Sequence, residues 1–202
     1  DFNPATYNAS TSQTAWTSST GEVWTINTGT AATGYKGVLV DRTIIMSDGV
    51  DDTIFTSTNV VPATNTIYTS FNAYASTGGS GKTVVGTGSL SGSLFQLSNT
   101  QASAWYSASV VSININKNIK NLDLVTISAN GTAGAVKIQN NNGTIVSGTG
   151  TAIAQIATLM GNTTYGQTNC LINTIVVSQT DNDATTKTAM YNLIRSLNNN
   201  AF

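Results

Sequence analysis

Three aspartates surround a glycine in the segment DGVDD, residues 48–52, in a chain where only 8% of the residues are charged. Calcium takes about six to eight oxygen ligands, and Asp48, Asp51 and Asp52 would supply a few of them alongside backbone carbonyls and water. The alternative is a turn, in which Asp48 bonds to nearby backbone N–H groups and Gly49 supplies the bend. We predict the turn and no bound metal, with a Ca²⁺ site on the three aspartates as the alternative.

The sequence offers no pair of carboxyl groups suited to glycoside hydrolysis. Glycoside hydrolysis uses one carboxyl group as acid and a second as nucleophile or base. Glu22 is the only glutamate, and Asp181 and Asp183 precede a predicted helix, where capping explains them. The chain has no histidine, which removes Ser–His and Cys–His nucleophile pairs and most zinc sites. We therefore predict no catalytic residue, no enzymatic activity and no cofactor.

Four residues carry the aromatic and amide groups that commonly hold sugars. Trp105 and Tyr106 are adjacent, and the segment NTTYGQTN contributes Tyr165 and Asn169. Their rings offer stacking surfaces and the amide offers hydrogen bonds. Because neighbouring residues of a strand point to opposite faces, one of Trp105 and Tyr106 belongs to the core. We predict a ligand site among these four residues, with a core position as the alternative for each aromatic.

Composition excludes two classes of partner and favours a place outside the cell. The formal net charge of the 202 residues is −1, so no basic field attracts nucleic acid. No run approaches the roughly 18 apolar residues that a membrane span requires. The polar residues are mainly Thr, Ser, Asn and Gly, which suits an extracellular or particle-bound protein. We expect a virion or cell-surface location, and the absence of an initial Met favours a processed chain or a piece of a longer one.

Short apolar runs separated by Gly, Ser and Asn predict β-strands along most of the chain. Residues 35–49 predict strand, turn and strand. In the segment 65–76, Ile67 and Phe71 share one face while Tyr68 and Ser70 take the other. Further strands are predicted in 83–88, 93–98, 103–116 and 171–179.

Two Asn-Gly pairs predict tight hairpin turns within residues 121–150. They are Asn130-Gly131 and Asn142-Gly143, and both residue types tolerate the positive φ that such turns require. Three or four strands are expected to follow one another here.

One helix is predicted, over residues 183–197, with Asp183 as its cap. Its apolar residues recur about once per turn, and they are Ala189, Met190, Leu193, Ile194 and Leu197. We expect the stripe of Ala189, Leu193 and Leu197 to pack on the edge of the folded domain. One helix among roughly a dozen strands predicts an all-β chain.

The order of these features along the chain is specific. An acidic DGVDD turn is followed by the aromatic TIYTSFNAY, the glycine-flanked VVGTG, the hairpin segment LVTISANGTAGAVKIQNNNGTIV, and a last strand and helix, INTIVVSQTDNDATTKTAMYNLIRSL. Over about residues 38–198 this order resembles the laminin-G-like, concanavalin A-like jelly-roll family. In that family a paired hairpin ends in an Asn-Gly turn, which Asn142 and Gly143 match. The resemblance implies a jelly-roll sandwich of two antiparallel sheets with one C-terminal helix.

This resemblance also implies a domain division and a class of function. Residues 37–202 are expected to form the jelly roll, and residues 1–36 form an N-terminal arm or its first strands. Similar domains occur in bacterial surface proteins and in phage fibre and head proteins. The implied function is non-catalytic attachment of a virion or bacterial cell to a host-surface glycan or receptor. The alternative is a structural domain that contacts neighbouring subunits of a larger particle or fibre, and a glycan-cleaving enzyme comes third.

Overall fold

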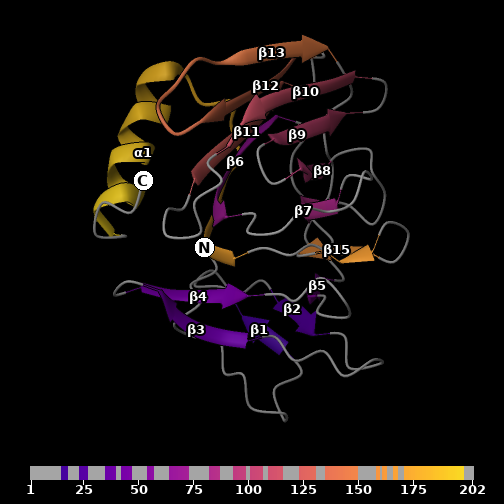
Figure 1. Ribbon diagram of the computed structural model, residues 1–202. Coiled ribbons are helices and arrows are strands. Elements are labelled where there is room, and N and C mark those ends of the chain that lie inside the picture. Colours follow the sequence, from indigo (N-terminus) through magenta and orange to yellow (C-terminus); the bar gives the residue numbers. More distant parts are fainter. Residues whose placement is uncertain are drawn as a thin grey trace.

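The computed structural model consists of β-strands and one C-terminal helix (Figure 1). It describes residues 15–17, 23–26, 35–39, 42–46, 54–56, 64–72, 82–86, 93–98, 101–106, 109–115, 123–130, 135–149, 158–159, 161–162, 166–167 and 171–197. The side chains that it describes belong to residues 64–71, 84–86, 101–104, 111–115, 123–130, 135–149 and 172–197.

Two large sheets make up the fold. The eight-stranded sheet has the order β1 (Ala15–Thr17), β2 (Val23–Ile26), β5 (Ile54–Thr56), β14 (Thr158–Leu159), β7 (Lys82–Gly86), β8 (Ser93–Ser98), β9 (Gln101–Tyr106) and β10 (Ser109–Asn114). The seven-stranded sheet has the order β13 (Val146–Thr149), β12 (Ala135–Asn140), β11 (Asp123–Asn130), β6 (Asn65–Asn72), β17 (Leu171–Ser178), β4 (Arg42–Met46) and β3 (Tyr35–Leu39). A small pair is formed by β15 (Gly161–Asn162) and β16 (Gly166–Gln167).

Neighbouring strands are antiparallel throughout the part of the chain that the structure describes. The helix α1 (Ala184–Leu197) follows β17 and lies along one side of the molecule (Figure 1). The predicted all-β class, with antiparallel sheets and a single C-terminal helix, is confirmed.

The inner face of the seven-stranded sheet is mostly apolar, although Asn65, Thr69 and Asp123 are buried on the same face. Ile67 lies opposite Ile127, and both side chains are fully buried. Strand β10 of the other sheet lies against β12 and β13, and a Cβ added to Gly148 would come within 2.8 Å of the Val111 side chain. The two sheets therefore approach so closely at these strands that residue 148 has no room for a side chain.

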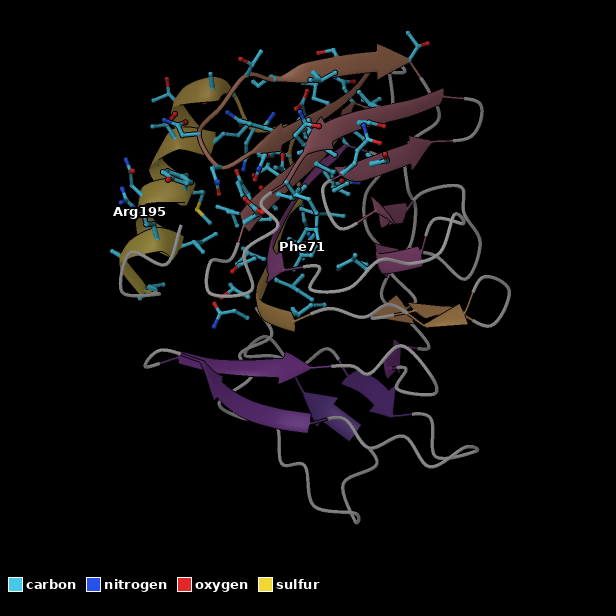
Figure 2. The ribbon with its side chains drawn as sticks, viewed as in Figure 1. Phe71 and Arg195 are labelled. Carbon is cyan, nitrogen blue, oxygen red and sulfur yellow. The ribbon has the colours of Figure 1, made fainter. Side chains whose placement is uncertain are left out.

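The outer face of the same sheet is mixed and is covered by α1. Strand alternation turns Tyr68 and Leu124 to this face, away from Ile67 and Ile127. Ile194 of the helix packs against both and is only 2% exposed. Partly buried Val176, Met190 and Tyr191 complete this cluster. Figure 2 shows Phe71 inside the molecule and Arg195 on the side of α1 that faces away from the sheet.

Several strands form as predicted, and antiparallel strands pair across both Asn-Gly sequences, with residues 131–134 outside the part of the chain that the structure describes. β6 buries Ile67 and Phe71 on one face and Tyr68 and Ser70 on the other. β11 and β12 pair with Asn130 opposite Ala135, and β12 pairs with β13 beyond the second Asn-Gly sequence. The segment 35–49 contains the antiparallel pair β3 and β4.

The second turn differs in detail from the prediction. The residue with a positive φ is Asn141, at 52°, and neither Asn142 nor Gly143 has a positive φ. The cause is a double contact with Leu124, because the Asn141 N–H donates to its carbonyl oxygen at 2.8 Å and Asn141 Oδ1 accepts from its N–H at 2.9 Å. Gly143 closes the turn with a bond to the Asn140 carbonyl oxygen at 3.0 Å, where a Cβ would also lie 3.0 Å from that oxygen.

The predicted packing face of the helix is wrong. Leu193 and Leu197 are 50% and 72% exposed, and Ala189 is exposed too. The buried face instead carries Lys187 and Ile194, with the helix lying across the sheet face rather than on its edge. The link between β17 and α1, residues 179–183, is hydrogen-bonded to β6 and, together with the buried contacts of Lys187, fixes the rotation of α1.

This packing predicts opposite results for two neighbouring substitutions. Ile194→Ala should lower the free energy of unfolding by about 2–5 kcal/mol, because it leaves a cavity between α1 and the sheet. Leu193→Ala should change it by less than about 0.5 kcal/mol, because the side chain is half exposed. Urea unfolding monitored by circular dichroism measures both. A larger loss from Leu193→Ala than from Ile194→Ala would contradict the observed orientation of the helix.

Candidate functional site

The link between β17 and α1 is fixed to strand β6 by hydrogen bonds. The Thr66 hydroxyl donates to the Thr180 carbonyl oxygen at 2.7 Å and accepts from the Asn182 N–H at 2.9 Å. The Asn182 amide donates to the Tyr68 hydroxyl at 2.8 Å. Burial raises the pKa of Tyr68 even though the bond from Asn182 opposes the rise, so this phenol stays neutral and serves as an acceptor.

Asp183 caps the helix as predicted. Its Oδ1 accepts the backbone N–H of Thr186 at 2.7 Å, which satisfies one of the N–H groups left over at a helix start. The same bond holds the pKa of Asp183 below its ordinary value.

Two lysines share the carboxylate of Asp181 beneath the first turns of α1. Lys187 is 4% exposed, and its ammonium donates to Ser128 Oγ at 2.8 Å. Its Nζ also lies 3.6 Å from Asp181 Oδ1, while Lys137 donates to Asp181 Oδ2 at 2.8 Å. This charge cluster of Lys137, Asp181 and Lys187 joins β12, the link and the helix.

The pKa values of this cluster follow from burial and from the opposite charges. Burial lowers the pKa of Lys187 more than the nearby Asp181 carboxylate raises it. Burial works against ionisation of Asp181 as well, but the hydrogen bonds from Lys137 and Ser128 and the two lysine charges outweigh it, so the pKa of Asp181 is lowered. Each charged group lies beside an opposite charge, so the cluster holds the helix in place.

A second polar group organises the β12–β13 turn around Asp123, which is 1% exposed. Asp123 Oδ1 accepts from the side-chain amides of Asn140 at 3.1 Å and Asn141 at 3.2 Å. The Asn140 amide also donates to the Asn114 carbonyl oxygen of β10 at 2.9 Å. These bonds link both sheets at one end of the sandwich.

The tip of this turn is exposed yet held in place. Asn142 and Gly143 are exposed, the Gln139 amide donates to the Gly143 carbonyl oxygen at 2.8 Å, and the Thr188 hydroxyl donates to Asn142 Oδ1 at 3.1 Å. The turn therefore presents amide groups to solvent on a backbone that is tied to both β12 and α1.

Trp105 and Tyr106, two of the predicted ligand residues, belong to the backbone of β9. Trp105 lies opposite Ser93 of β8 and Val110 of β10, and Tyr106 lies opposite Ser109. Their end of β9 is the one far from Asn114, so they do not join the amide-rich turn. Tyr165 and Asn169 lie outside the described residues, and the ligand site stays a prediction.

The alternative metal site, Asp48, Asp51 and Asp52, also lies outside the residues that the structure describes. Within the ranges that it does describe, no group of three or more His, Cys, Asp or Glu side chains is placed to hold a metal ion. None of the helical structure seen there is long and apolar enough to cross a membrane.

Sequence reasoning missed the charge cluster and the role of Asp123. One signal was present, because Lys187 stands at helical spacing from Met190, Tyr191 and Ile194, three residues that face the sheet. A lysine on such a face needs an anion nearby, and Asp181 is the acid six positions earlier. Asp123 carried no comparable signal, since its amide partners are 17 and 18 residues away.

No protein-family model matches the sequence, and no curated protein matches it. The fold does match solved structures. The binding domain of botulinum neurotoxin serotype D/C matches with a TM-score of 0.60 at 16% identity, over 93% of this chain and 51% of that one. A structure of botulinum neurotoxin type C, described as entering cells through two ganglioside molecules, matches with a TM-score of 0.62 at 14% identity, over 93% and 50%.

An enzyme shares the fold as well. Trypanosoma rangeli sialidase in complex with sialic acid matches with a TM-score of 0.64 at 10% identity, over 91% of this chain and 31% of the sialidase chain. At such identities the likeness concerns the fold alone. The chain spans about half or less of the length of each of these structures, so their activities are not transferred to it.

The charge cluster predicts non-additive effects on stability. Asp181→Asn should lower the free energy of unfolding by about 3 kcal/mol, because it leaves the buried ammonium of Lys187 without its anion. Lys187→Met should cost less than about 1 kcal/mol, and the double variant should resemble Lys187→Met, since Met fills the space without a charge. Denaturant unfolding of the three variants gives the coupling energy. Additive losses in the double variant would show that Asp181 does not neutralise Lys187.

The lowered pKa of Lys187 predicts an alkaline rise in stability. Between the lowered pKa and its ordinary value, the unfolded chain retains a proton that the folded protein has released, so the free energy of unfolding increases with pH there. Denaturant unfolding at a series of alkaline pH values should show this rise in the wild-type protein relative to Lys187→Met. Parallel curves for the two proteins would contradict the lowered pKa.

Proposed function

We propose that this chain is a non-catalytic surface module that attaches a virion, as part of a phage fibre, tail or head, or a bacterial cell to a host-surface glycan or receptor. The proposal rests on the fold of the chain, which is similar to that of botulinum neurotoxin binding domains. One of these neurotoxin structures is in complex with a compound named SialylT, and another is described with gangliosides. The laminin-G-like resemblance of the sequence supports the same class. An extracellular location is part of the proposal.

The contacts of the described carboxylates support a non-catalytic role. Asp183 caps α1, Asp181 pairs with two lysines, and Asp123 accepts bonds from two amides. Hydrolysis of a glycoside requires one carboxyl group that is free to donate a proton and a second that is free to attack or to activate water. These three aspartates instead make contacts that stabilise the fold.

The proposed ligand residues are Trp105, Tyr106, Tyr165 and Asn169. With a net charge of −1 and 8% charged residues, the protein would recognise a sugar by stacking and by hydrogen bonds rather than by a strong field. The affinity should then depend little on salt concentration.

The second candidate function is a structural domain that assembles into a larger particle or fibre. The observation in its favour is the pair of exposed leucines on α1, Leu193 and Leu197, because exposed apolar side chains that lie together mark contact surfaces.

A glycan array tests attachment directly. We expect selective binding that Trp105→Ala weakens about tenfold, the loss of roughly 1.4 kcal/mol of stacking. Trp24→Ala is the matched control, since β2 and β9 are separated by four strands in the eight-stranded sheet. Equal losses from both variants would place the sugar elsewhere, and an array without any selective binding would contradict the glycan-binding function.

A further inference from the structure

The exposed tip of the β12–β13 turn contains an Asn-Gly sequence, Asn142-Gly143, with a chemical reactivity of its own. In such a sequence the backbone nitrogen of the glycine can attack the side-chain carbonyl carbon of the asparagine, because glycine has no Cβ to hinder the approach. Asn142, Gly143 and the following Thr144 are all exposed. The tip therefore combines the residue types for deamidation with access to the water that the reaction consumes.

The folded turn holds both reacting groups in other bonds. The Gly143 N–H, whose nitrogen is the nucleophile, donates to the Asn140 carbonyl oxygen at 3.0 Å. The Asn142 side chain, which is the group attacked, accepts a bond from the Thr188 hydroxyl of α1 at 3.1 Å through its Oδ1. The nitrogen attacks only after it has lost its proton and turned toward the Asn142 side chain, so its bond to Asn140 has to break first.

Gly143 is held on its other side as well. The Gln139 amide donates to the Gly143 carbonyl oxygen at 2.8 Å, so the peptide groups before and after this glycine are both bonded to β12. Asn141, the residue before the reactive pair, is bonded to Leu124 through its backbone N–H and its side-chain Oδ1. Reaction at Asn142 therefore requires the turn to open.

We propose that Asn142 is a deamidation site whose rate is set by the contact between this turn and α1. In the open turn, the Gly143 nitrogen forms a bond to Asn142 Cγ, and the bond between Cγ and Nδ2 breaks. Nδ2 leaves as ammonia with the proton that the Gly143 nitrogen has lost, and a five-membered succinimide remains. Water then adds to one of the two succinimide carbonyl groups and gives aspartate or isoaspartate. The reaction needs no oxidant and no cofactor.

Both products change the surface of the tip. A carboxylate replaces the exposed amide of Asn142, which adds one negative charge to a chain whose formal net charge is −1. Isoaspartate also directs the backbone through the former side chain, which inserts one carbon atom before Gly143. The bonds from Gly143 to Asn140 and Gln139 depend on the ordinary backbone spacing, so the isoaspartyl turn should no longer close.

The folded and the unfolded full chain should deamidate at different rates. Peptide mapping by mass spectrometry, over several weeks at mildly alkaline pH, follows the replacement of the Asn142 amide by a carboxyl group. Conversion should be at least about tenfold faster in guanidinium chloride than in the folded protein, because only the open fraction of a folded segment reacts. Equal rates would show that the turn gives no protection, and an unfolded chain that keeps its Asn142 amide would show that this residue is not a deamidation site.

The contact with α1 is tested by removing one hydroxyl group. Thr188→Val keeps the shape of the half-buried side chain and should speed conversion of Asn142 in the folded protein about two- to tenfold, the effect of one lost hydrogen bond. Thr188→Ser keeps a hydroxyl and should stay close to the wild-type rate. Thr185→Val is the matched control, because it removes an exposed hydroxyl from the same helix.

Circular dichroism should show that these variants are folded, and the comparison of folded and unfolded wild-type protein needs no variant. A folded Thr188→Val protein that deamidates at the wild-type rate would show that α1 does not control the reaction. Equal acceleration by Thr185→Val would lead to the same conclusion. The reaction involves no ligand, so its outcome is independent of whether the chain binds a sugar.

Discussion

The ammonium group of Lys187 must be neutralised inside the protein, and the position of the C-terminal helix depends on this requirement. A buried charge without a partner costs several kcal/mol, roughly a third or more of the stability of a typical domain. Asp181 supplies the negative charge from the link before α1, and Ser128 accepts a hydrogen bond from the sheet. Rotating the helix by even one residue would separate these groups. Lys137 adds a contact from β12, so the helix, the link and two strands are held in one relative position.

The seven-stranded sheet is buried on both faces, because the other sheet covers its inner face and α1 covers its outer face. Its inner face packs against the other sheet through apolar side chains such as Ile67 and Ile127. Its outer face combines Tyr68 and Leu124, which contact Ile194, with the polar groups that receive Lys187. A helix held only by an apolar stripe could slide or rotate on the sheet, whereas hydrogen bonds between particular residues specify one orientation. The leucines of α1 are left outside because the polar groups, rather than total apolar burial, decide which side faces the sheet.

Local patterns sufficed to predict several of the strands, the strand pairs on either side of the two Asn-Gly sequences, the helix limits and its cap, because each depends on residues close in sequence. Asp183 and Thr186 are three positions apart, and the hairpins need only a few residues with suitable φ. The helix face was predicted wrongly because apolar spacing alone favoured the leucines. The deciding contacts join residues 59 positions apart, as between Ser128 and Lys187, or more than a hundred, as between Thr66 and Asn182. Such pairings become visible only once the strand order is known, and the same holds for the amides around Asp123.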